Sequence, residues 1–244
     1  MMCRVDGGFV TILSDGAVWD LDEERNEYRV IAFDAKPVLL PHISAALVSL
    51  GSGDFLPAMY LSNSQKWTSF DVLLGCVCDD ARATFGRLQR IAFPAYRTLR
   101  CAIYLAGWSD ERRRFETYAV DVDPSGAVSE PEPLPEVVFS PAPGEEALAA
   151  VGVLGKGIDP TDNVSLGLHM QAMRLTPGEM GAADPPPVGH MVGGFLQKTI
   201  LMKDRIYTEI LHRWDDKIGE PVIPKPGEVE ALKAALTEPI GEAE

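Results

Sequence analysis

The spacing of hydrophobic residues changes along the chain and separates segments that favour strands from segments that favour helices. Between residues 70 and 88, apolar residues recur every three or four positions, which predicts an amphipathic helix with one face packed on a core. Short apolar or alternating runs predict strands at 9–13, 28–33, 38–40, 43–50, 99–107, 115–122, 190–201 and 205–214. Further helices are predicted from about residue 55, at 144–154, at 162–173 and at 228–236.

Polar and proline-rich segments divide these elements. The acidic stretch 20–26 and the segment 108–114 predict solvated loops, the second joining two strands of a hairpin. Residues 124–143 contain six prolines and many acidic residues, which predicts a loop over the surface. Asp54 is a candidate N-cap for the helix that follows it.

The order of the elements favours an α+β fold. Two groups of strands, each followed by its own helices, suit two sheets packed face to face with helices outside them. The length of 244 residues suits one large domain or two small ones, and it is sufficient for a sizeable core. We expect one large domain to span residues 1–223, followed by a polar tail at 224–244 that is either a frayed end or a docking segment.

The net charge of −14 disfavours binding to nucleic acid, because an acidic surface repels phosphate groups. No apolar run is long enough for a membrane span, and no signal peptide is apparent, so we expect a cytoplasmic protein with reduced thiols. A virus-encoded protein made in a cytoplasm would look the same. The four cysteines have no zinc-binding spacing, and we expect neither a metal nor a cofactor.

Other candidate sites do not fit their motifs. The pair Gly155-Lys156 lacks the Ser or Thr that a phosphate-binding loop needs after the lysine. The acidic stretch at 20–24 lacks the glycine of a calcium loop. Cys76 and Cys78 are two residues apart on a predicted helix, so they point to different faces. The four histidines are scattered along the chain, with no zinc-protease spacing.

Several segments together resemble a proteasome-type N-terminal-nucleophile (Ntn) hydrolase. They are the glycine hairpin and strand ending at Asp15, Lys36 before a strand, the glycine turn at Gly51, the strand pair at 105–126 and the small-residue turn at 192–194. The resemblance covers roughly residues 6–215 and rests on the order and spacing of these segments. It implies a four-layer αββα sandwich.

The resemblance also implies which residues would form a site. In that family the first residue of the mature chain is the nucleophile and its own amine is the base. Asp15 is similar to the acid, Lys36 to the lysine, and Gly51 to the oxyanion-hole glycine. Gly189 and Val192 stand where the family has a second acid and a serine.

The nucleophile is the missing part of this pattern. Only Cys3 could serve, after removal of two residues, and it stands closer to Asp15 than the family's nucleophile stands to its acid. We therefore expect a non-catalytic scaffold in which Asp15, Lys36 and Gly51 are retained by the fold. Two alternatives stay open: an active amidohydrolase or peptidase that uses Cys3, and a small-molecule binder that uses the cleft between the sheets.

The expected role of the scaffold is assembly or protein binding, as a homo-oligomer or within a larger assembly. Similar chains with eroded sites occur in phage and prophage regions, so the resemblance also implies a structural role in a virion.

Overall fold

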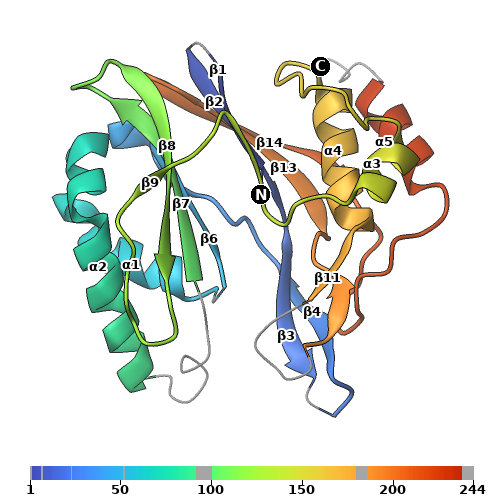
Figure 1. Cartoon of the computed structure of the whole chain (residues 1–244), viewed down its shortest axis with the longest axis horizontal. Helices are drawn as coiled ribbons and strands as arrows, with labels where there is room; N and C mark the ends of the chain where they lie inside the picture. The colour runs from blue at the N-terminus through green and yellow to red at the C-terminus, as the bar shows by residue number, and fades with distance from the viewer. Residues whose placement is uncertain are drawn as a thin grey trace, which may run out of the picture.

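Two five-stranded antiparallel sheets form the centre of the fold (Figure 1). The computed structural model describes residues 2–6, 8–22, 24–51, 53–91, 101–179 and 186–237, with only the backbone described for residues 2–6. The first sheet has the order β10-β1-β2-β13-β14 and the second has the order β5-β6-β7-β8-β9.

The strands of the first sheet are β1 (Met2–Asp6), β2 (Phe9–Asp15), β10 (Val137–Phe139), β13 (Phe195–Met202) and β14 (Arg205–Arg213). Those of the second are β5 (Val38–Leu40), β6 (Ala45–Leu50), β7 (Cys101–Ser109), β8 (Arg114–Val122) and β9 (Glu132–Pro133). Two separate hairpins are β3 (Ala17–Asp22) with β4 (Glu27–Phe33), and β11 (Pro177–Glu179) with β12 (Val188–His190). Short 3-10 helices lie at Pro41–Ile43 and Ser64–Lys66.

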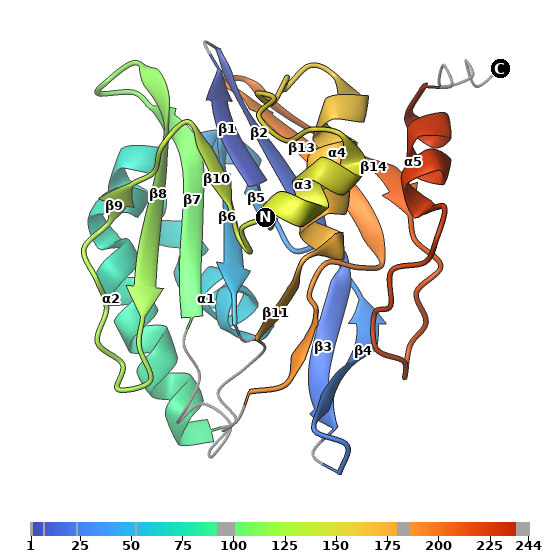
Figure 2. The ribbon, with the colours of Figure 1, turned by 45° about the vertical axis from the view of Figure 1, so that its right-hand side comes forward.

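Each sheet carries its own helices on its outer face (Figures 1 and 2). Helices α1 (Phe55–Asn63) and α2 (Phe70–Ile91) cover the second sheet, while α3 (Glu145–Val151), α4 (Asn163–Leu175) and α5 (Glu228–Thr237) lie on the side of the first. The predicted apolar stripe of α2 is buried against the second sheet, and the helix prediction at 70–88 is confirmed.

Three of the apolar clusters separate the sheets and helices as layers. One joins α1 and α2 to the second sheet. Another lies between the sheets, where Val10, Ile12 and Leu201 of the first meet Ala46 and Val48 of the second. The last packs β2 and β13 against α4. Helix α5 then packs closely on α4, because Gly167 has no side chain where Leu236 and Leu232 approach it.

Four local predictions were wrong in detail. Residues 20–22 of the predicted loop 20–26 belong to strand β3, because the β3–β4 pairing lets Asp20 face solvent and lets Asp22 pair with Arg29. The segment 124–143 contains the short strands β9 and β10. The expected strand 190–201 is interrupted by a turn at 191–194. Asp54 precedes α1 but makes no side-chain capping hydrogen bond.

The predicted strand at 99–107 begins outside the described residues, since Leu99 lies in the undescribed segment 92–100. In the part of the chain that is described, no helix is both long and apolar enough to cross a membrane.

Candidate functional site

The candidate site lies where the end of strand β2 meets the turn before β13. Strands β2 and β13 run antiparallel with Asp15 opposite Leu196, so the last residue of β2 lies beside the first residues of β13. The amides of Gly16 and Ala17 donate to the Gly193 carbonyl over 3.0 and 3.1 Å. This pairing brings together two segments that lie 178 residues apart in the chain.

Asp15 is buried and uses both of its carboxylate oxygens at this junction. Its Oδ1 lies 2.5 Å from the Lys36 Nζ. Its Oδ2 accepts hydrogen bonds from the amides of Ala17 and Gly193, each over 3.2 Å. The Lys36 side chain is 23% exposed, so the pair lies at the edge of the interior rather than deep inside it. The two residues named from the sequence as acid and lysine are therefore in contact.

The turn itself requires glycine at two positions. A Cβ on Gly193 would lie 2.6 Å from Val222 and 2.9 Å from Asp216. Gly194 has φ of +77°, and a Cβ there would lie 2.5 Å from the ring of Phe33. Small residues are thus needed because side chains close over this turn from several sides.

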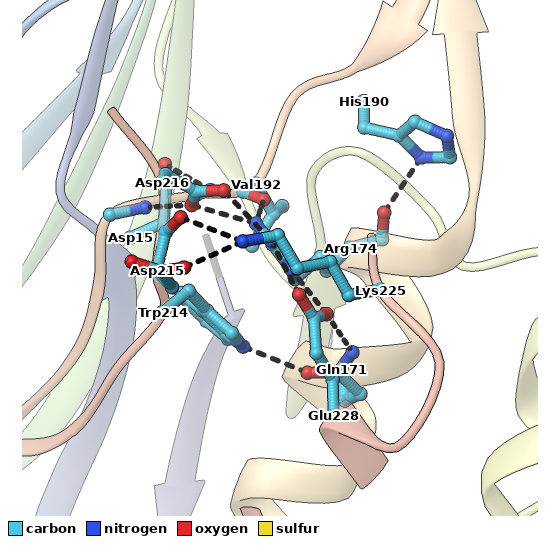
Figure 3. Close-up of polar contacts among 12 residues, drawn as sticks. Asp15, Gln171, Arg174, His190, Val192, Trp214, Asp215, Asp216, Lys225 and Glu228 are labelled. Atoms are coloured by element: carbon cyan, nitrogen blue, oxygen red, sulfur yellow. Dashed lines mark hydrogen bonds and ion pairs between the residues drawn. The ribbon is translucent and has the colours of Figure 1, made fainter. Parts of the chain in front are cut away.

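Arg174 supports the other side of the turn and is completely buried (Figure 3). Its Nη1 donates to the Val192 carbonyl and to Asp216 Oδ2, both over 2.9 Å. Its Nη2 donates to Asp216 Oδ1 at 2.8 Å and to Glu228 Oε1 at 3.0 Å, and its Nε donates to Glu228 Oε2 at 2.9 Å. All five N–H groups of the guanidinium are therefore satisfied.

Two more contacts complete this cluster. The amide of Gly194 donates to Asp216 Oδ2 over 2.7 Å. Gln171 donates to Glu228 and accepts from the indole N–H of Trp214, whose ring lies 5.0 Å from the Arg174 guanidinium carbon. We call Gln171, Arg174, Trp214, Asp216 and Glu228 the arginine cluster.

The cluster holds its groups in their charged forms. Burial alone would raise the pKa of Glu228, but hydrogen bonds from Arg174 and Gln171 outweigh it and the pKa is lowered. Burial likewise opposes the charge of Arg174, yet Glu228 and Asp216 raise its pKa overall. His212 has a lowered pKa, chiefly because it is buried. The electrostatics therefore favour a fixed ionic network over a group ready to transfer a proton.

Cys3 and Gly51, which were also named from the sequence, are not joined to this junction by any described contact. The backbone of Cys3 pairs with Ile12 and Val138. Ile12 precedes Asp15 by three residues, which corresponds to roughly 10 Å along a strand. Gly51 follows β6 with φ of +105°, at the end of the β5–β6 pair where Lys36 also lies.

Gly189 and Val192, which stand where the resembled family has a second acid and a serine, supply neither an acidic group nor a hydroxyl. Gly189 belongs to β12 and lines a surface hollow of about 220 Å³ with Tyr28, His190 and Ile223. Val192 is buried and contributes its carbonyl to Arg174. No group of side chains among the described residues has the make-up of a metal site.

The sequence did not single out the arginine cluster. The one signal in the sequence is Trp214 followed by two aspartates, a pattern typical of a turn anchored by a tryptophan. Trp214 is buried, and the second of the two aspartates, Asp216, accepts hydrogen bonds from Arg174. The two acids that bind Arg174, Asp216 and Glu228, lie 42 and 54 residues from it in the sequence, a separation that no local pattern spans.

Comparisons with known proteins place the architecture. No protein-family model and no curated protein sequence matches the chain. Its structure is similar to a Gly-1 mutant of Anbu from Hyphomicrobium sp. strain MC1, with a TM-score of 0.53 at 11% identity over 96% of this chain and 92% of that one. It is equally similar to Anbu, described as an ancestral beta-subunit, from Yersinia bercovieri, with a TM-score of 0.53 at 10% identity over 96% and 91% of the two chains. The chain therefore has an Ntn-hydrolase-type, proteasome-like fold.

Proposed function

We propose that the chain is a non-catalytic, proteasome-like scaffold that acts by assembly or protein binding. The observation that carries the proposal is the hydrogen bonding of the turn at Gly193 and Gly194, called the glycine turn from here on. Its two amides, Gly193 N–H and Gly194 N–H, donate to the carboxylates of Asp15 and Asp216. Both amides are taken up by buried carboxylates of the chain itself, so this turn, which is distinct from the Gly51 turn named as the oxyanion hole, offers no free donor to a substrate.

The position of Cys3 supports the same proposal. A nucleophile must stand within hydrogen-bond reach of the group that activates it. The strand register puts Cys3 opposite Ile12, about three strand residues from Asp15 and the Lys36 that it binds. The Asp15–Lys36 pair and the arginine cluster then act as internal ties between β2, the glycine turn, α4 and α5.

The finer description of the architecture and role belongs to this proposal. We take the succession of helices, sheet, sheet and helices as a four-layer αββα sandwich, on the strength of the three apolar clusters that separate these layers. One structural relative is described as a subunit, which favours a protein partner for this chain too. A structural role in a phage virion stays a prediction, and the neighbouring genes would test it.

The alternative is an active Ntn amidohydrolase or peptidase, and one contact favours it. Asp15 and Lys36 are 2.5 Å apart, which is the acid–lysine contact that such an enzyme would need. Lys36 is also partly exposed, so a substrate could approach it.

A hydrolase assay separates the two proposals. The purified full chain is incubated with a panel of N-acylated peptide amides, and product is measured by mass spectrometry beside Lys36→Ala. The scaffold proposal expects no turnover above buffer for either protein and a lower melting temperature for Lys36→Ala. Turnover by the wild type that disappears in Lys36→Ala would overturn it. Intact mass gives a second reading, because a chain beginning at Cys3 would support the enzyme.

A further inference from the structure

Strand β14 forms an open edge of the first sheet. It pairs with β13 along its full length, and no other described strand pairs with its second side. The outward N–H and C=O groups of an unpaired edge are a template for pairing with another strand. Figure 2 shows β14 at the end of its sheet, beyond β13.

This edge differs from the other edges of the two five-stranded sheets in its length. The other edges of the two five-stranded sheets are β10, β5 and β9, which have three, three and two residues, whereas β14 has nine. Proteins usually blunt an edge with short strands, Lys or Pro. Strand β14 contains neither residue, and Tyr207 and Ile210 are 49% and 45% exposed on it.

The pairing geometry of β14 is regular over its first six residues. A register shift between Leu196 and Gln197 affects only the end of the strand, after Ile210. Over the regular stretch, Arg205, Tyr207 and Glu209 share one face, and Ile206, Thr208 and Ile210 share the other.

We propose that β14 pairs antiparallel with β14 of a second copy of this chain, about a two-fold axis through Tyr207. This inference deepens the proposed assembly role and rests on it. In this register Arg205 of each copy lies opposite Glu209 of the other, Tyr207 lies opposite itself, and Ile206 lies opposite Thr208. Two five-stranded sheets become one sheet of ten strands.

The charges on β14 favour a second copy of this chain as the binding partner, and they favour this register over others. The register makes two Arg–Glu pairs directly across the interface, and opposite charges in this arrangement are stabilising. An axis through Glu209 would instead place this carboxylate opposite its own copy, which is destabilising. The chain as a whole carries −14, so two copies repel, but β14 itself has two arginines and one glutamate. This edge is therefore a place where two copies can approach with little repulsion.

Exposed apolar groups add to the same register. Tyr207 would pack against its own copy as an aromatic pair, and Ile210 would reach Ile206 of the other copy along the diagonal. These contacts would cover the two most exposed hydrophobic side chains of the strand, Tyr207 and Ile210.

Sedimentation velocity of the full chain over a range of concentrations tests the association. We expect a concentration-dependent dimer, and we expect Arg205→Glu to raise its Kd by about tenfold or more, because both Arg–Glu pairs become like-charge pairs. Arg113→Glu makes the same charge change in the exposed β7–β8 loop and should leave the Kd unchanged.

Cysteine crosslinking tests the register. Tyr207→Cys places two thiols opposite each other at the axis, so mild oxidation should give a covalent dimer on a non-reducing gel. Thr208→Cys is the matched control, since its copies would lie about 7 Å or more apart along the diagonal, beyond the usual disulfide span.

Four outcomes would overturn the proposal. If the wild type stays monomeric at high concentration, the interface does not form. If Arg205→Glu leaves the dimer intact, the interface lies on another surface. Crosslinking by Thr208→Cys but not by Tyr207→Cys contradicts the stated axis. Binding of β14 only to a different protein, detected as loss of that complex in Arg205→Glu, contradicts the choice of a second copy. None of these results bears on hydrolase activity, which decides the scaffold proposal separately.

Discussion

Arg174 and Glu228 lie 54 residues apart in the sequence and form a two-bond ion pair in the fold, with Nε–Oε2 and Nη2–Oε1 distances of 2.9 and 3.0 Å. The pair ties the first residue of α5 to the end of α4. Because Arg174 also holds Asp216 and the Val192 carbonyl, the docking of α5 is linked physically to the glycine turn.

Replacement of Arg174 by Met should destabilise the fold by about 3–5 kcal/mol, because it leaves two carboxylates buried without a cation. Chemical denaturation would measure the change in the free energy of unfolding. Arg82→Met is the control, since the Arg82 side chain is 54% exposed and pairs only across the surface with Asp79. We expect that change to stay below about 1 kcal/mol. Equal effects of the two substitutions would contradict a structural role for the arginine cluster.

Acid should weaken the fold partly through Glu228. Its pKa is lower in the folded chain than in the unfolded chain, since Arg174 and Gln171 outweigh the effect of burial. The stability it contributes is therefore present above the unfolded pKa and is lost as the pH falls through the folded pKa. Glu228→Gln should flatten the dependence of the melting temperature on pH below about pH 5. Glu230→Gln, at an exposed position of the same helix, should keep the wild-type profile. A parallel shift of both profiles would argue against this assignment.

Gly194→Ala should cost about 2–4 kcal/mol, because it combines a left-handed backbone with a clash against Phe33. Gly219→Ala separates these two effects. Gly219 has φ of +87° but open space around a Cβ, so we expect only about 1 kcal/mol there. The double variant Gly194→Ala/Phe33→Ala should recover part of the loss in a double-mutant cycle. Additive effects would show that Phe33 does not limit this position.

Cys76 should be a poor nucleophile in the native chain. Burial, followed by the charge and hydrogen bond of Asp80, raises the pKa of its thiol to about 11. At pH 8 only about one thiol in a thousand would be ionised. Asp80→Asn should speed the alkylation of Cys76 by iodoacetamide several-fold, as followed by peptide mass spectrometry. Asp79→Asn, on the exposed side of α2, should not, and equal acceleration by both would contradict a specific effect of Asp80.

Local patterns predicted the parts of the fold that depend on neighbours in the sequence. The apolar stripe of α2 and the alternation in β8 gave these elements nearly at their observed ends. The resemblance named Asp15 as the acid and Lys36 as the lysine, and the two side chains are in contact in the fold.

Long-range pairing decided the parts that the sequence did not predict. The acidic residues 20–22 look like a loop until strand β4 and Arg29 lie beside them. Arg174 looks like a surface residue at the end of a helix until Asp216 and Glu228 enclose it. In both cases the charge is accommodated by a partner that the chain supplies only after folding.

The pairing of β2 with β13 also has a consequence for how the chain is made. Asp15 pairs with Leu196, so the hairpin of β1 and β2 cannot complete its sheet until the residues of β13 have also left the ribosome. During synthesis the edge of β2 that will pair with β13 stays unpaired. The second sheet and its helices can form first, because the strands of that sheet are closer together in the sequence. The nascent protein therefore exposes the apolar strand β2 until β13 has been synthesised and pairs with it.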